Sequence, residues 1–161
     1  MKKLVLKLLI SAIAMTVSCA LFAADTDKSA ETAAAQPTPA FDEPAVKAEV
    51  EKFLRDNAKA MQDENLEASL ATVAEKDKAQ AKAIFEQIFK MFDLKYTLEK
   101  IEIVVKDANT AEATVVQKTE KVAGPEFRDN RGKFLHTLKK VDDKWTFADT
   151  KILSVDFLDN Q

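Results

Sequence analysis

The chain has 161 residues and a formal net charge of −3, and it contains one histidine, one cysteine and two glycines. This length suggests one domain plus an extension, and the acidic balance disfavours nucleic acid, whose phosphates need a basic face. So few histidines, cysteines and glycines leave no common transition-metal site and no glycine-rich phosphate loop, so we expect neither a metal nor a cofactor.

Residues 1–24 have the three parts of a secretory signal peptide: a basic start, a short apolar centre and a small-residue exit. We expect cleavage near Ala23 or Ala24, which predicts a secreted or periplasmic protein with no membrane segment after cleavage. An uncleaved membrane anchor is one alternative, although the apolar run is short for a bilayer span. A lipoprotein attached through Cys19 is another, disfavoured because apolar rather than polar residues follow this cysteine.

Residues 25–42 are small, polar and proline-bearing, and nothing in them can bury an apolar face. This composition predicts a disordered tether. The folded domain is therefore expected to span residues 43–158.

Three helices are predicted at the start of this domain. Asp42 can cap the first helix, and Asp63 or Asn65 can open a short second one. The third helix, from about residue 75 to residue 92, carries a broad apolar stripe. Such a stripe is typical of a helix that lies in a core.

The hydrophobic period then changes from helical to two, which predicts strands over residues 95–106 and 111–122. A longer connection over residues 123–132 leads to a last hairpin, with a tight turn at Asp142-Asp143. Helices first and strands second indicate the α+β class, with the helices on one face of a four-stranded antiparallel sheet.

This order of elements, together with the segment VDDKWTF at residues 141–147, resembles the nuclear transport factor two-like superfamily. That superfamily includes ketosteroid isomerase, scytalone dehydratase and polyketide cyclase-like proteins. The resemblance covers about residues 44–157, and Asp143 stands where many relatives have glycine. It implies a cone-shaped, cystatin-like fold: three N-terminal helices on the concave face of a curved sheet, with a pocket at the open end. In relatives the pocket binds a ligand, or the outer sheet face forms a dimer.

A two-residue turn in the last hairpin would pair His136 with Asp149 on the concave face. A three-residue turn would place them on opposite faces. In the paired register, the carboxylate of Asp149 would raise the pKa of His136 unless burial outweighs the effect of the charge. The pair is a candidate general base, although a buried histidine with a hydrogen-bond partner can be purely structural.

The two-residue turn also decides which face of the sheet the other side chains of the hairpin occupy. Trp145 is predicted to be a core anchor. The predicted pocket-lining residues are Tyr96, Phe134, Leu138, Phe147 and Phe89. The predicted dimer face consists of Leu135, Val141 and Ile152.

The first predicted function is a non-catalytic exported domain that binds a small apolar ligand or a protein partner and forms a homodimer. The first alternative is a cofactor-independent isomerase or dehydratase that uses His136 and Asp149. The second is a structural accessory domain.

Overall fold

The computed structural model describes residues 41–158. The predicted signal peptide, and the predicted tether apart from its last two residues, lie outside this range. No helix within the described range is long and apolar enough to cross a membrane.

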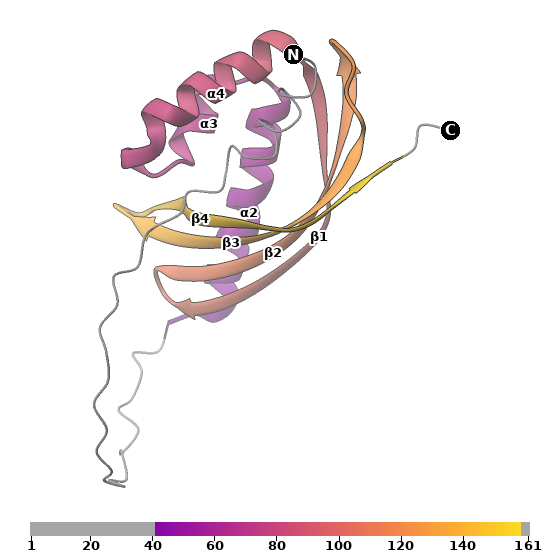
Figure 1. Ribbon diagram of the computed structural model, residues 1–161. Coiled ribbons are helices and arrows are strands. Elements are labelled where there is room, and N and C mark those ends of the chain that lie inside the picture. The colour runs from indigo at the N-terminus through magenta and orange to yellow at the C-terminus, as the bar shows by residue number, and fades with distance from the viewer. Residues whose placement is uncertain (1–40, 159–161) are drawn as a thin grey trace, which may run out of the picture.

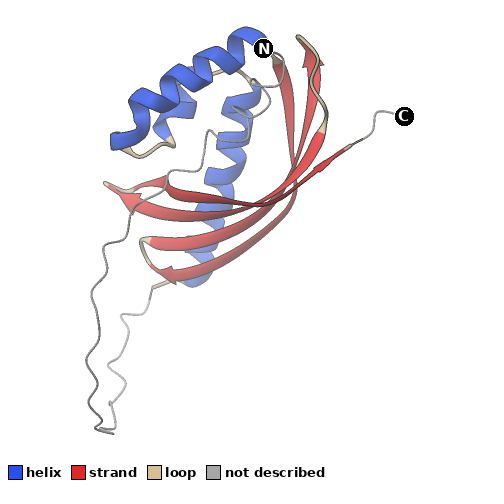
Figure 2. Ribbon diagram, viewed as in Figure 1, coloured by secondary structure: helices blue, strands red, loops and turns tan. Residues whose placement is uncertain are grey.

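Three helices precede four antiparallel strands that pair in chain order, as Figures 1 and 2 show. This arrangement confirms the predicted α+β class. The helices are α2 (Glu43–Gln62), α3 (Leu66–Ala71) and α4 (Lys78–Met91), and the short 3-10 turn η1 (Glu75–Asp77) precedes α4. The strands are β1 (Asp93–Asp107), β2 (Thr110–Ala123), β3 (Asn130–Val141) and β4 (Lys144–Phe157).

Side-chain caps fix where the first two helices begin. Asp42 Oδ1 accepts a hydrogen bond of 3.1 Å from the amide of Ala45, and Asn65 Oδ1 accepts one of 3.0 Å from the amide of Ala68. Each cap satisfies a backbone N–H that has no partner inside the helix. Asp42 therefore caps α2 as predicted, and Asn65 rather than Asp63 opens α3.

The core lies where α2 crosses the concave side of the sheet (Figure 1). Val50 of α2 is fully buried against small side chains of β2, Ala111 and Ala113. Trp145 closes this core from β4 with 7% of its surface exposed. Its Nε1 donates a hydrogen bond of 3.0 Å to Glu49 of α2.

β-Bulges bend the sheet around α2. In β4, Ala148 and Leu153 have no partner in the pairing with β3. In the pairing of β1 with β2, Glu99, Lys106 and Val122 have none. Each extra residue interrupts the alternation of side chains and increases the local bend and twist. The sheet therefore curls instead of lying flat, and α4 lies across the opening of the curl (Figure 1).

Helix α4 is not the core helix that its apolar stripe predicted. None of its residues is buried, and its large apolar side chains are only partly covered. The reason is that its apolar side faces an open cavity, not a packed surface.

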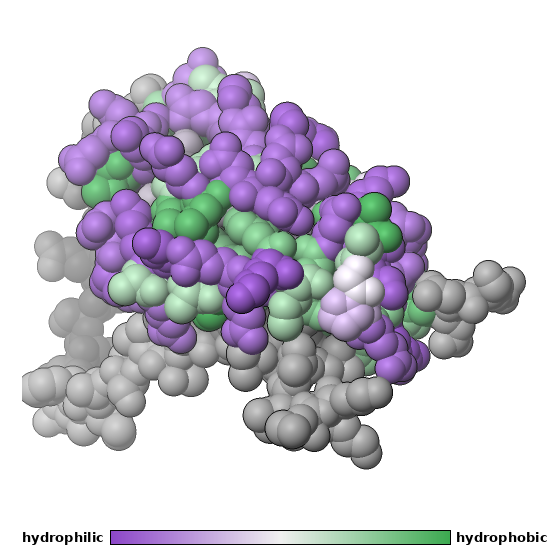
Figure 3. All heavy atoms as spheres, turned by 90° about the horizontal axis from the view of Figure 1, so that it is seen from above, coloured by the Kyte–Doolittle hydropathy of each residue, from purple (hydrophilic) through white to green (hydrophobic). Residues whose placement is uncertain are grey.

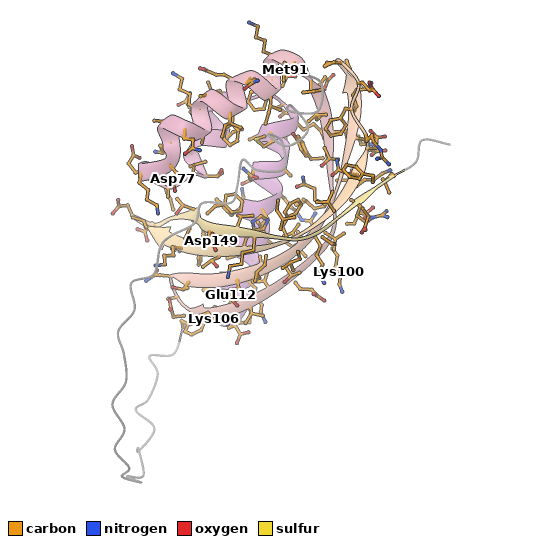
Figure 4. The ribbon with its side chains drawn as sticks, in the orientation of Figure 1. Asp77, Met91, Lys100, Lys106, Glu112 and Asp149 are labelled. Carbon is orange, nitrogen blue, oxygen red and sulfur yellow. The ribbon has the colours of Figure 1, made fainter. Side chains whose placement is uncertain are left out.

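The convex face of the sheet is rich in ion pairs. Arg131 Nε and Nη2 donate hydrogen bonds of 2.6 and 2.8 Å to the two carboxylate oxygens of Glu99, two strands away. Lys106 lies 3.1 Å from Glu112 in another pair, and both side chains point away from the helices in Figure 4. Charged side chains therefore surround the few apolar side chains of the convex face.

Candidate ligand-binding cavity

A cavity of about 300 Å³ lies between α4 and the concave face of the sheet. Ala81, Ile84 and Phe85 of α4 form its roof, and Leu54 and Ala58 of α2 contribute to its floor. Seen from above, hydrophobic side chains form a strip between two hydrophilic rims (Figure 3). The volume is at the small end of the range of about 300–1,000 Å³ that ligand pockets occupy.

Polar side chains gather on the wall toward one end of the sheet. Tyr96, Thr119 and Asn130 are direct cross-strand neighbours on β1, β2 and β3, and all three line the cavity. Gln117, two residues before Thr119, also lines it and donates a hydrogen bond of 3.3 Å to the Thr119 hydroxyl. We call Tyr96, Gln117, Thr119 and Asn130 the tyrosine end of the cavity.

The second polar position lies further along the sheet and consists of His136 and Thr150, which we call the histidine end. These residues are directly opposed on β3 and β4, and His136 Nδ1 lies 2.8 Å from Thr150 Oγ1. The rings of Phe134 and Phe147 flank the imidazole, with centroids 6.0 and 4.9 Å from it. Within the described residues, His136 Nε2 makes no hydrogen bond.

Burial shifts the pKa values of both titratable rings on this wall in the direction that favours the uncharged form. It lowers the pKa of His136 to about 4, because the apolar surroundings disfavour the imidazolium. It also raises the pKa of Tyr96 to about 12, helped by the negative charge of Glu64. The tyrosine is therefore a neutral donor and the histidine a neutral imidazole.

The predicted pairing of His136 with Asp149 is wrong. The two-residue turn was predicted correctly, since Val141 pairs with Lys144. The bulge at Ala148 then shifts the register by one, so Asp149 pairs with Thr137 and His136 pairs with Thr150. No carboxylate among residues 41–158 is hydrogen-bonded to the histidine, so its pKa falls with burial, in place of the rise expected from a carboxylate partner.

Asp149 still borders the cavity, at its rim. It lies on β4 at the end of the molecule where α4 begins, and Asp77 lies on the same side (Figure 4). Asp77 also borders the cavity. No lysine or arginine is among the residues of the described chain that line this cavity.

Three of the five predicted pocket residues, Tyr96, Phe134 and Phe147, line the cavity. Leu138 does not, because it is fully buried in the core beneath α2. Phe89 stacks on Phe85, with ring centroids 6.1 Å apart, and it is Phe85 that reaches the cavity.

The three residues of the predicted dimer face do not share one surface. Ile152 lines the cavity, because the bulge at Ala148 turns it inward. Val141 is 57% exposed beside the turn, and Leu135 is half-buried on the convex face. Leu135 is therefore the member of the set that lies within the sheet's outer surface.

Sequence reasoning missed Gln117, Thr119, Asn130 and Thr150. A signal for the first two was present. Ala111 and Ala113 face the core, and continuing their alternation along the strand places Gln117 and Thr119 on the same concave face. No comparable signal existed for Thr150, whose orientation depends on the bulge.

The curved sheet, the three helices and the cavity at the open end define a domain of the nuclear transport factor two-like, cystatin-like class. A candidate scytalone dehydratase from Novosphingobium aromaticivorans has a TM-score of 0.61 and 17% identity, covering 73% of this chain and 91% of that chain. A nuclear transport factor two-like protein of unknown function from Pseudomonas putida has a TM-score of 0.59 and 13% identity, covering 68% and 87%. A ketosteroid isomerase-like protein from Erwinia carotovora has a TM-score of 0.54 and 19% identity, covering 71% and 99%. At these identities the likeness establishes the fold.

The family itself is more specific. Residues 52–158 match the family described as anti-sigma-I factor RsgI9, C-terminal domain, and the chain belongs to this family. Comparison with curated proteins found no match.

Proposed function

We propose that this protein is an exported, non-catalytic domain that holds a small, largely apolar molecule in its concave cavity. The observation that carries the proposal is that α4 has no buried residue and directs its apolar side chains into about 300 Å³ of open space. Leaving large apolar side chains unpacked forgoes stability, since burial is worth roughly 25 cal/mol per Å². An apolar ligand would recover that burial.

Family membership supports a binding role. The family is named after the C-terminal domain of an anti-sigma-I factor, a class of regulatory protein. A regulator needs a part that recognises a molecule or a partner. The cavity is the feature of this chain best suited to that task.

The enzymatic alternative uses the same cavity, with His136 as a base. Its neutral imidazole could accept a proton, but burial lowers its pKa to about 4 and makes it a weak base. Its ring partner is a hydroxyl, that of Thr150, and a hydroxyl does not stabilise an imidazolium as a carboxylate would. These contacts favour binding over catalysis.

Cavity binding can be tested with the neutral fluorophore N-phenylnaphthylamine, whose emission rises in an apolar site. The structure offers a matched pair of variants on α4: Ala81 lines the cavity, whereas Ala83 is exposed and does not. We expect Ala81→Phe to fill the cavity and abolish the fluorescence increase, and Ala83→Phe to leave it unchanged. Equal binding to both variants, or no binding to the unmodified protein, would refute the proposal.

Export can be tested separately by mass spectrometry of the protein purified from a bacterial host. We expect a mature N-terminus near residue 24 or 25, from the three-part composition of residues 1–24. An intact Met1 or a lipid on Cys19 would contradict export by cleavage.

A further inference from the structure

We propose that the ligand is an elongated, uncharged molecule with a hydroxyl or similar polar group at each end and an apolar middle. This inference rests on the proposed binding function and specifies the chemistry of the same cavity.

The two polar positions of the wall are separated by an apolar zone. Between the tyrosine end and the histidine end lie Val115, Phe134 and Ile152, which are cross-strand neighbours on β2, β3 and β4. The ring of Phe134 lies over Gly132, where a Cβ atom would overlap it. An apolar body is therefore the part of a ligand that fits between the two ends.

The separation of the ends sets the length of the ligand. On β2, the tyrosine end extends from Gln117 to Thr119, which pairs with Tyr96, and Ala113 pairs with His136 at the histidine end. Four to six residues of strand span about 13 to 20 Å. The distance across the concave face is shorter, because inward side chains on a curved sheet converge. A molecule of two rings in line reaches from one end to the other.

Both ends have hydrogen-bonding atoms to offer. Within the described residues, the Tyr96 hydroxyl makes no hydrogen bond and neither does His136 Nε2. Neither atom is among the polar atoms that are buried without a partner, and both residues line the cavity. A ligand hydroxyl can accept from the tyrosine at one end and can donate to or accept from the imidazole at the other.

Charge selects against anions. The carboxylates of Asp77 and Asp149 border the cavity, and no lysine or arginine of the described chain lines it. The imidazole of His136 is neutral at physiological pH because of its burial. A ligand carboxylate would be buried without a cation, which costs far more than burying a neutral hydroxyl.

The test uses three rigid probes of the same length and isothermal titration calorimetry. They are para,para′-biphenol with a hydroxyl at each end, para-phenylphenol with one hydroxyl, and biphenyl para,para′-dicarboxylate. We expect the biphenol to bind roughly 3- to 10-fold more tightly than para-phenylphenol, which is the effect of one net hydrogen bond. We expect the dicarboxylate not to bind.

Two variants show whether the two ends act as proposed. Tyr96→Phe removes only a hydroxyl, and His136→Phe removes the imidazole but keeps an aromatic ring. In either variant one polar end remains, so the preference for the biphenol over para-phenylphenol should fall to about one. Because this preference is a ratio measured on one protein sample, partial unfolding of a variant does not change it. Thr150→Val is a second variant at the histidine end, where Thr150 orients the imidazole.

Each other result has a defined meaning. Equal affinity of the unmodified protein for the biphenol and para-phenylphenol overturns the inference, and so does tight binding of the dicarboxylate. If no biphenyl probe binds but N-phenylnaphthylamine does, the inference fails and the proposed cavity function stands. If N-phenylnaphthylamine also fails to bind, both are wrong.

Discussion

His136 shows how one residue's surroundings decide its chemistry. It is the only histidine in the chain, and it sits between two phenylalanine rings with a threonine hydroxyl as its partner. Desolvation lowers its pKa to about 4. The folded protein therefore holds this ring neutral at a pH where the unfolded chain would protonate it.

This difference predicts an acid-sensitive component of stability. The unfolded pKa is about 6.5 and the folded one about 4, so the unfolded chain binds the proton first as the pH falls. The stabilisation is fully present above about pH 6.5 and is lost toward about pH 4, with a loss of about 2 kcal/mol by about pH 5. Urea unfolding at several pH values measures it.

His136→Gln is the control for this prediction. It removes the titrating ring but leaves every carboxylate, so the variant should lose less stability than the unmodified protein between neutral and acidic pH. Proton NMR of the single imidazole gives an independent reading of the pKa. A midpoint at or above about 6.5 would mean that the ring is solvated or paired with a carboxylate.

Residue-level features of the last hairpin were only partly predictable. The turn at Asp142-Asp143 follows from the sequence, because aspartate tolerates the left-handed conformation that both residues adopt, with φ of 49° and 59°. The bulge at Ala148 does not follow, because an extra residue in a strand leaves no clear compositional mark. A correct turn therefore led to an incorrect partner for His136.

At the scale of elements, strand β4 shapes the cavity through its bulges. Its inward-facing residues are Phe147, Thr150, Ile152, Val155 and Phe157, all of which line the cavity. Their spacing alternates between three and two residues, where a regular strand would keep a constant spacing of two. Next to the bulge, the amide of Phe147 donates a hydrogen bond of 2.9 Å to the carbonyl of Thr72, the C-cap residue of α3.

Deleting Ala148 separates curvature from strand pairing. Ala148 has no partner in β3, so its removal lets Asp149 follow Phe147 in regular alternation while Thr150 stays opposite His136. We expect a folded protein with a flatter sheet and at least a 10-fold loss of N-phenylnaphthylamine affinity, because the bulge bends the strand. Circular dichroism and fluorescence titration measure the two effects. A deletion that folds and binds normally would show that the bulge does not shape the cavity.

Helix α4 shows what hydrophobic periodicity can and cannot predict. The apolar stripe correctly predicted a helix, but a stripe that faces a cavity has the same sequence pattern as one that faces a core. Distinguishing them requires knowing what lies opposite. Here the opposite surface is the curved sheet, and a cavity of about 300 Å³ lies between it and the helix.

At the scale of the whole molecule, homodimerisation remains a prediction. Leu135 lies half-buried on the convex face, with Thr114 and Lys151 as its cross-strand neighbours. If two molecules pair through this face, Leu135→Lys should place a buried charge in the interface and convert the dimer to a monomer. Light scattering at micromolar concentration measures the mass.

Val141→Lys is the matched control, because Val141 is exposed beside the turn. This variant should keep the mass of the unmodified protein. If the unmodified protein is a monomer, the prediction of a homodimer is wrong. If Leu135→Lys remains a dimer, the contact lies elsewhere on the molecule.

The overall fold was more predictable than the site. The change of hydrophobic period near residue 93, and the caps at Asp42 and Asn65, fix the elements and their order. The cavity depends on the bulged residues of the strands and on the distance between α4 and the sheet. These are tertiary properties to which many residues contribute a little, so no short motif encodes them.

The absence of buried residues in α4 has a consequence for amide hydrogen exchange. Segments with few buried contacts open without global unfolding, whereas α2, with Val50 fully buried, should exchange only through much larger openings. We expect the amides of α4 to exchange at least 10-fold faster than those at the centre of α2. A cavity-bound molecule should slow exchange in α4 selectively, since it supplies the contacts that the helix lacks. Mass spectrometry of exchanged peptides would then locate the ligand without any chemical label, and uniform protection of both helices would argue against a separately opening α4.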